Sequence, residues 1–123
     1  MKLKEIIKFL ENEIPKELAL QTDNIGLQGK YDLDVEINSI KIYMDLFAED
    51  DEFLKDTLII THHPPLFKPK TPTYTIHSNW DIIKGGANEA LANTLDIEVT
   101  DYFDDFLTMF SPTLIKIIKN SKK

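Results

Sequence analysis

One short apolar segment, ending in two histidines and two prolines, constrains the fold more than any other part of the chain. Residues 58–61 are too few for a typical helix and rich in β-branched side chains, so they predict a buried strand. Pro64 and Pro65 have no amide hydrogen to donate, so the strand ends before them in a stiff loop. His62 and His63 therefore follow the carboxyl end of a strand, where open α/β sheets place their ligand sites.

The segments around this strand predict an α/β domain. Apolar residues at helical spacing predict a helix over 3–14, and residues 35–44 alternate as in an irregular strand. Residues 49–55 are short and acidic and predict one or two helical turns. A strand, a helical connection and a second strand in this order favour a parallel pair. We therefore expect a mixed or mostly parallel sheet flanked by helices, with a further helix over 87–95.

Composition excludes several classes of protein. The 123 residues suffice for one core, and 42% hydrophobic with 28% charged residues is ordinary for a globular domain. No apolar run approaches the ~20 residues that span a bilayer, and no secretory signal pattern is present, so a cytoplasmic location is expected. The absence of cysteine excludes disulfides and thiolate metal ligands.

The charge balance argues against nucleic-acid binding. The formal net charge is −7, and all 14 basic residues are lysine. An acidic surface repels phosphates, and the forked guanidinium that clamps phosphate or reads guanine is missing.

All three histidines of the chain, His62, His63 and His77, fall within sixteen residues. Asp81 adds a carboxylate four residues after His77. Imidazole and carboxylate without thiolate suit iron, zinc, manganese or similar divalent ions. A bare pair of histidines is more often a hydrogen-bonding feature of a loop, and Asp45 is expected to be a cap or turn residue rather than a ligand.

Two geometries are open for His77. Only nine residues, 64–72, join the two flanking extended stretches, fewer than the dozen usual for a parallel crossover. A parallel return along a five-residue strand needs ~16 Å, whereas nine extended residues reach ~30 Å, so it is possible. An antiparallel hairpin would instead leave His77 ~15 Å from His62.

Three motifs occur in a fixed order along the chain: Asp23-Asn24-Ile25-Gly26-Leu27-Gln28, then Leu58-Ile59-Ile60-Thr61-His62-His63-Pro64, then His77-Ser78-Asn79-Trp80-Asp81 with Gly85-Gly86-Ala87-Asn88-Glu89-Ala90-Leu91-Ala92. Together they resemble the NIF-three-like family, whose members are often named GTP cyclohydrolase type 2 homologues. The resemblance assigns residues 1–104 to the first α/β lobe of that fold. Residues 105–123 do not resemble the family and form a divergent tail, in which Ser111-Pro112 predicts the start of a helix.

The resemblance implies a two-lobed fold with two divalent metals, assembled into hexamers. By motif, His62 would bind one metal and His63 the other, Asp81 would be the third ligand, and His77 would be the catalytic candidate, a proton carrier beside the site. No other cofactor-binding residue is implied. In the family, a bridging glutamate and another histidine come from a His-x-x-x-Glu motif, and this chain has no histidine after His77.

We therefore expect a truncated protein of this family with a partial metal site of hydrolase type. It would hold one weakly bound ion (zinc, iron or manganese) or none, unless a second polypeptide completes the site. The family's hexamers imply a homo-oligomer. Two alternatives remain open: a non-catalytic interaction or scaffold subunit, and a metal-binding partner completed by a separately encoded second lobe.

Overall fold

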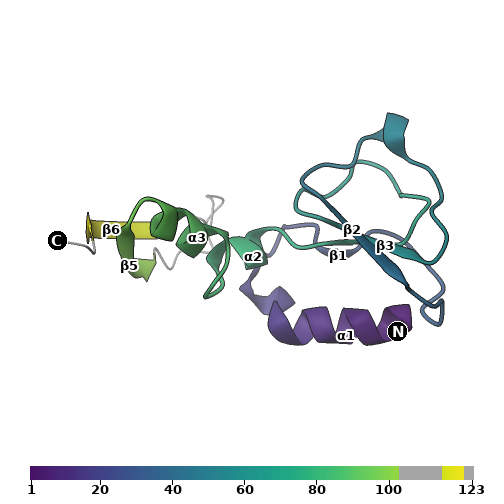
Figure 1. Cartoon of the computed structure of the whole chain (residues 1–123), viewed down its shortest axis with the longest axis horizontal. Coiled ribbons are helices and arrows are strands. Elements are labelled where there is room, and N and C mark those ends of the chain that lie inside the picture. The colour runs from purple at the N-terminus through teal and green to yellow at the C-terminus, as the bar shows by residue number, and fades with distance from the viewer. Residues whose placement is uncertain (103–114, 121–123) are drawn as a thin grey trace. The chain divides into compact units, whose positions relative to one another are not determined.

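The computed structural model describes residues 1–102 and 115–120 and divides into two compact units (Figure 1). The first unit comprises Met1–Lys16 and Asn24–His77, and the second comprises Glu17–Asp23 and Ser78–Lys123. The boundary predicted at residue 104 concerns where the family resemblance ends, and it stays a prediction. Among the described residues, no helix is both long and apolar enough to cross a membrane.

The first unit is a four-stranded mixed sheet with one helix on it, which confirms the predicted α/β class. The strand order is β1-β4-β3-β2, with β3 parallel to both of its neighbours and β1 antiparallel to β4. The elements are α1 (Leu3–Glu13), β1 (Gly26–Leu27), β2 (Ser39–Tyr43), β3 (Thr57–Thr61) and β4 (Thr73–Thr75).

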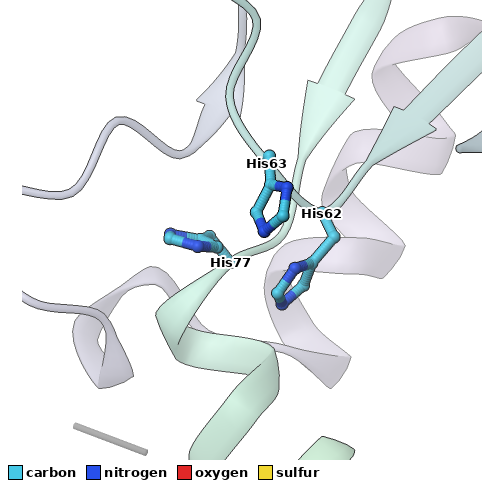
Figure 2. A group of neighbouring side chains, drawn as sticks. All are labelled: His62, His63 and His77. Atoms are coloured by element: carbon cyan, nitrogen blue, oxygen red, sulfur yellow. The ribbon is translucent and has the colours of Figure 1, made fainter. Parts of the chain in front are cut away.

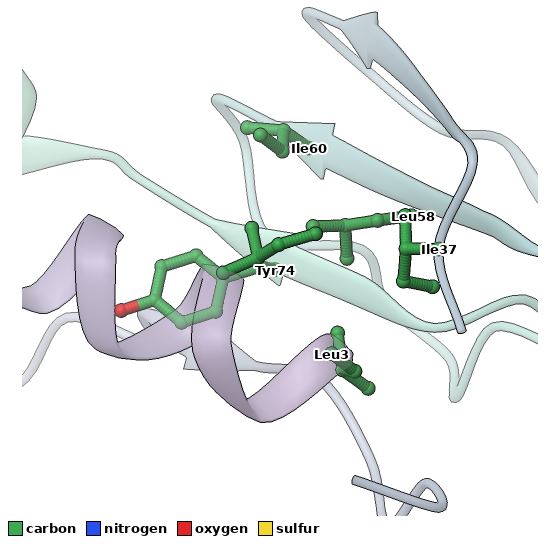
Figure 3. Close-up of a cluster of buried hydrophobic side chains, with 6 residues drawn as sticks. Leu3, Ile37, Leu58, Ile60 and Tyr74 are labelled. Atoms are coloured by element: carbon green, nitrogen blue, oxygen red, sulfur yellow. The ribbon is translucent and has the colours of Figure 1, made fainter. Parts of the chain in front are cut away.

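Helix α1 covers one face of this sheet. At its start, the backbone N–H of Lys2 donates to the carboxylate of Glu5 at 2.7 Å, which satisfies a donor and places negative charge at the positive end of the helix dipole. Pro15 follows its end, and a 3-10 turn, η1 (Lys16–Leu18), comes next. The buried core between helix and sheet consists of Leu3, Ile6, Ile37, Leu58, Ile60 and Tyr74 (Figure 3).

Strand β3 is the centre of the sheet, and all five of its residues are buried. Leu58 and Ile60 belong to the core with α1, whereas Ile59 and Thr61 point to the opposite face because side chains alternate along a strand. Burial on both faces explains why the segment is apolar without alternation, as in the parallel sheets of α/β proteins.

The opposite face is covered by the loop from β2 to β3 and the loop from β3 to β4, which are hydrogen-bonded to each other. The Thr71 hydroxyl, which is fully buried, donates to the carbonyl of Glu52 and accepts from the N–H of Leu54, each at 2.8 Å. The predicted helical turns before β3 are present only as a 3-10 turn, η2 (Ala48–Asp50). The connection from β3 to β4, residues 62–72, contains no helix.

The strand predicted over 35–44 is shorter in the structure, where β2 begins at Ser39. The cause is a change of partner: the N–H groups of Asn38 and Ser39 both donate to Asp56 O, at 2.8 and 3.2 Å. Before that point, the N–H of Ile37 donates to Met1 O at 2.8 Å. The irregularity in the alternating pattern therefore marks the place where the segment leaves the amino-terminal residues and joins β3.

The second unit contains α2 (Ser78–Ile82), α3 (Ala87–Thr94) and an antiparallel pair, β5 (Ile97–Tyr102) and β6 (Ile115–Asn120). The helix predicted from residue 111 is wrong over 115–120, which form β6; residues 111–114 lie outside the described part. The physical reason is the β-branched residues Ile115, Ile117 and Ile118, which favour extended backbone over helix. At the start of α2, the N–H of Ser78 donates to Asp23 Oδ2 at 3.0 Å.

Two tyrosines of the first unit should respond oppositely to loss of the hydroxyl. The Tyr74 hydroxyl is buried without a hydrogen-bond partner among the described residues, whereas the Tyr31 hydroxyl donates to Pro69 O at 2.8 Å. Tyr74→Phe should therefore raise the free energy of unfolding by about 1 kcal/mol, and Tyr31→Phe should lower it by about 1 kcal/mol, in urea titrations. Equal destabilisation by both changes would contradict this.

The same pair predicts an alkaline limit to stability. Burial raises the pKa of Tyr74, and likewise that of Tyr31, to about 12. Because the unfolded chain ionises near pH 10 and the folded chain does not, stability should fall between about pH 10 and pH 12. Tyr74→Phe should remove its share of that loss.

Candidate metal site

The parallel pairing of β3 with β4 brings His62 and His77 to the same end of the sheet. Thr61, the last residue of β3, lies opposite Thr75, the last residue of β4. The N–H of Ile76 donates to Thr61 O at 3.0 Å and extends the pairing by one residue. The parallel alternative left open by the sequence is therefore the correct one, and the hairpin is excluded.

The backbone of both histidines after β3 is also fixed by the neighbouring strand. The N–H of His62 donates to Tyr43 O at 3.2 Å, and the N–H of His63 donates to Met44 O at 2.9 Å. These bonds continue the β2–β3 ladder past the last strand residue. The histidines consequently start from a defined backbone rather than from a free loop.

The three imidazoles converge (Figure 2). One potential ligand atom from each of His62, His63 and His77 lies within 4.8 Å of the others, and no other group of three or more metal-ligating side chains is found in the described residues. The ring centroids are 4.8 to 5.5 Å apart, and the rings are tilted or edge-on rather than stacked. His62 and His77 are half-buried, and His63 is exposed.

Asp45 contacts this cluster, contrary to the expectation that it serves as a cap or turn residue. Its Oδ1 lies 2.7 Å from Nδ1 of His63. Asp45 follows β2 just as His63 follows β3, and the two strands are parallel neighbours. The signal that could have revealed this contact is positional: both residues come directly after strands whose carboxyl ends share one edge of the sheet.

The three imidazoles fit the donor set of a divalent cation. Nitrogens bound to one tetrahedral ion at about 2.0–2.1 Å lie about 3.4 Å from each other. The ligand atoms here lie within 4.8 Å of one another, so each ring would need to move inward by about 1 Å, which side-chain torsions allow. Three imidazoles also leave a fourth position for another ligand.

Asp81 lies in α2, in the second unit, and its side chain is 8% exposed. Its assignment as a metal ligand therefore rests on the motif and stays a prediction. The structure brings together the two histidines predicted as ligands and the one predicted as a proton carrier.

Comparison with known proteins gives a consistent result. A family model described as Duf34/NIF3 (NGG1p interacting factor 3) matches residues 1–73. The chain is 36% identical over 104 residues to the GTP cyclohydrolase 1 type 2 homolog of Methanothermobacter thermautotrophicus, a match that covers 85% of this chain and 43% of that relative. A Methanocaldococcus jannaschii protein of the same name is also 36% identical, with 80% of this chain and 49% of the relative covered.

Among solved structures, reduced HcgD from Methanocaldococcus jannaschii is similar with a TM-score of 0.67 and 34% identity, covering 85% of this chain and 51% of that one. A Bacillus cereus protein related to NIF3 gives a TM-score of 0.64 and 27% identity, covering 80% of this chain and 33% of that one. The chain thus spans about half the length, or less, of the relatives that it matches.

The hydroxyl groups of the last residues of β3 and β4, just before the histidines, should be energetically coupled. Thr61 Oγ1 and Thr75 Oγ1, both fully buried, lie 2.7 Å apart across β3 and β4. Thr61→Val or Thr75→Val alone leaves one buried hydroxyl without its partner and should cost about 1–3 kcal/mol of unfolding free energy. The double variant should cost clearly less than the sum of the two, as measured by urea denaturation. Strictly additive costs would show that the pair does not hold the strands together.

Proposed function

Because the chain belongs to the DUF34/NIF3 family, we propose that it binds a divalent metal ion of the kind that hydrolases use, with His62, His63 and His77 as ligands. The observation that supports this proposal is the approach of the three ligand atoms to within 4.8 Å. Asp81, which the family motif points to, is the proposed fourth ligand.

The donor types restrict the metal. Imidazole and carboxylate ligands without thiolate suit zinc, iron or manganese. An ion held here would supply Lewis acidity to a bound substrate. The histidines would each present one nitrogen to the ion, and the half-buried position of His62 and His77 would limit competition from water.

The role of His77 separates two forms of this proposal. In the first, His77 is a ligand, which its closeness to the other two rings favours; the centroid of its ring is 4.8 Å from that of His62. In the second, it stands beside a site made by His62, His63 and Asp81 and carries a proton, a task suited to imidazole near neutral pH. Loss of metal affinity on removal of His77 distinguishes the first from the second.

For this chain alone we propose metal binding without GTP hydrolysis. The relatives carry the name GTP cyclohydrolase 1 type 2 homolog, but the chain covers less than half of the first two of them. No histidine follows His77, so a His-x-x-x-Glu motif, which by family resemblance would add ligands for a second ion, is absent from this sequence. Hydrolysis would then require a carboxylate from outside these 123 residues.

Calorimetric titration of the untagged, metal-free protein with zinc tests the proposal. We expect one ion per chain, and we expect His62→Ala, His63→Ala and His77→Ala each to weaken binding at least about tenfold, since each removes one of a small number of ligands. The zinc-loaded protein should release no product from GTP. Lys70→Ala, a change at an exposed position of the same loop, is the matched control and should bind as the wild type does.

Unchanged affinity in all three histidine variants would refute the site. Loss of binding in His62→Ala and His63→Ala, with full affinity in His77→Ala, would assign His77 to proton transfer. Two tightly bound ions per chain would show that further ligands are present.

A second candidate function, as a subunit of a homo-oligomer, is favoured by the exposed edge of the sheet. Strand β2 has a strand partner on one side only within the described residues. Ile40 and Ile42 are 48% and 76% exposed, although they pair in register with Leu58 and Ile60 of the core. A second copy pairing through β2 would cover these side chains and the open backbone groups of the edge.

Sedimentation velocity tests this association. The wild type should sediment as an oligomer, and Ile42→Lys should shift it toward the monomer because a charge on the covered apolar face opposes burial. Lys41→Ala changes the neighbouring residue, which points to the other face of the strand, and should leave the sedimentation coefficient unchanged. A monomeric wild type would rule the association out.

A further inference from the structure

The contact between Asp45 and His63 is not explained by stability. Oδ1 of Asp45 lies 2.7 Å from Nδ1 of His63, yet the two side chains are 43% and 47% exposed. Exposed charge pairs contribute little to folding because water competes for both groups and screens them. Because this short bond adds little to stability, we look for its role in the arrangement of the histidine cluster to which His63 belongs.

The backbone holds the two residues in a fixed relation. The N–H of His63 donates to the carbonyl of Met44, the residue before Asp45, at 2.9 Å. Both residues therefore leave the sheet from adjacent points of one parallel ladder. The side-chain bond then fixes the remaining freedom, the rotation of the imidazole.

This bond determines which nitrogen of His63 has a lone pair available to bind a metal ion. A neutral imidazole carries one N–H, and a carboxylate beside Nδ1 favours the tautomer in which Nδ1 carries it. The lone pair is then on Nε2. Figure 2 shows the ring of His63 extending from its backbone toward the space between the rings of His62 and His77.

We infer that Asp45 is a positioning residue of the metal site: it holds His63 in the Nδ1–H tautomer and directs Nε2 toward the ion. The inference rests on the proposed function, because it assigns a role toward the ion held by His62, His63 and His77. Carboxylates commonly accept the second N–H of metal-binding histidines, and they fix the ring and increase the basicity of the ligating nitrogen. Asp45 has the position that this role requires, with no need to touch the ion.

Asp45→Asn tests the inference with two measurements. In the metal-free protein at about pH 8, where a free imidazole is neutral, long-range proton–nitrogen NMR should show the Nδ1–H tautomer of His63 in the wild type and its loss in the variant. Calorimetry with zinc should show binding weakened about 10- to 100-fold, the usual effect of removing such a partner. The NMR spectrum also reports whether the variant is folded.

Glu49→Gln is the matched control, because it removes the same charge from the loop that follows Asp45. It should leave the tautomer and the zinc affinity unchanged, which separates the specific hydrogen bond from the general effect of negative charge. A wild-type His63 protonated on Nε2, or an Asp45→Asn variant that binds zinc as the wild type does, would overturn the inference and leave the proposed function intact. Absence of zinc binding by the wild type would overturn both.

Discussion

The parallel pairing of β3 with β4 is the constraint on which the rest of the first unit depends. With Thr61 opposite Thr75, the two strands end together, and the residues that follow them must share one edge of the sheet. The connection between them has to travel back along the strand, and it does so without a helix. Four prolines within 62–72 restrict this path, and the bonds of Tyr31 to Pro69 and of Thr71 to Glu52 hold it against the sheet.

Backbone hydrogen bonds continue past the ends of the strands into the candidate site. The N–H groups of His62 and Ile76 donate to the last residues of the neighbouring strands, and that of His63 donates to Met44, the residue after β2, so the backbone is held up to the residue before His77. Only side-chain torsions then remain to be set, and in His63 the carboxylate of Asp45 restricts these as well. A site with its backbone ordered in advance loses less entropy on binding an ion than one that must fold around it.

Local sequence was sufficient to predict several of the elements and the position of the histidine pair, but not their partners in space. Helix α1 and strand β3 follow from periodicity and β-branching, and His62 and His63 from their place after β3. The direction of β4 relative to β3 could not be predicted because the loop over 64–72 is long enough for either a parallel or an antiparallel return. The contact of Asp45 with His63 depends on which strand lies beside β3, which single-segment patterns do not reveal. The prediction fails over 115–120 because a serine–proline pair is typical of a helix start, whereas the three isoleucines of this segment favour extended backbone.

All three histidines belong to one continuous strand–loop–strand segment of the first unit, and this has a consequence for folding. Contacts between residues so close in sequence need little loop closure, so the cluster can assemble early, before distant parts of the chain are in place. Asp45 lies outside this segment and is joined to it by the β2–β3 ladder, so its contact with His63 depends on the sheet being intact.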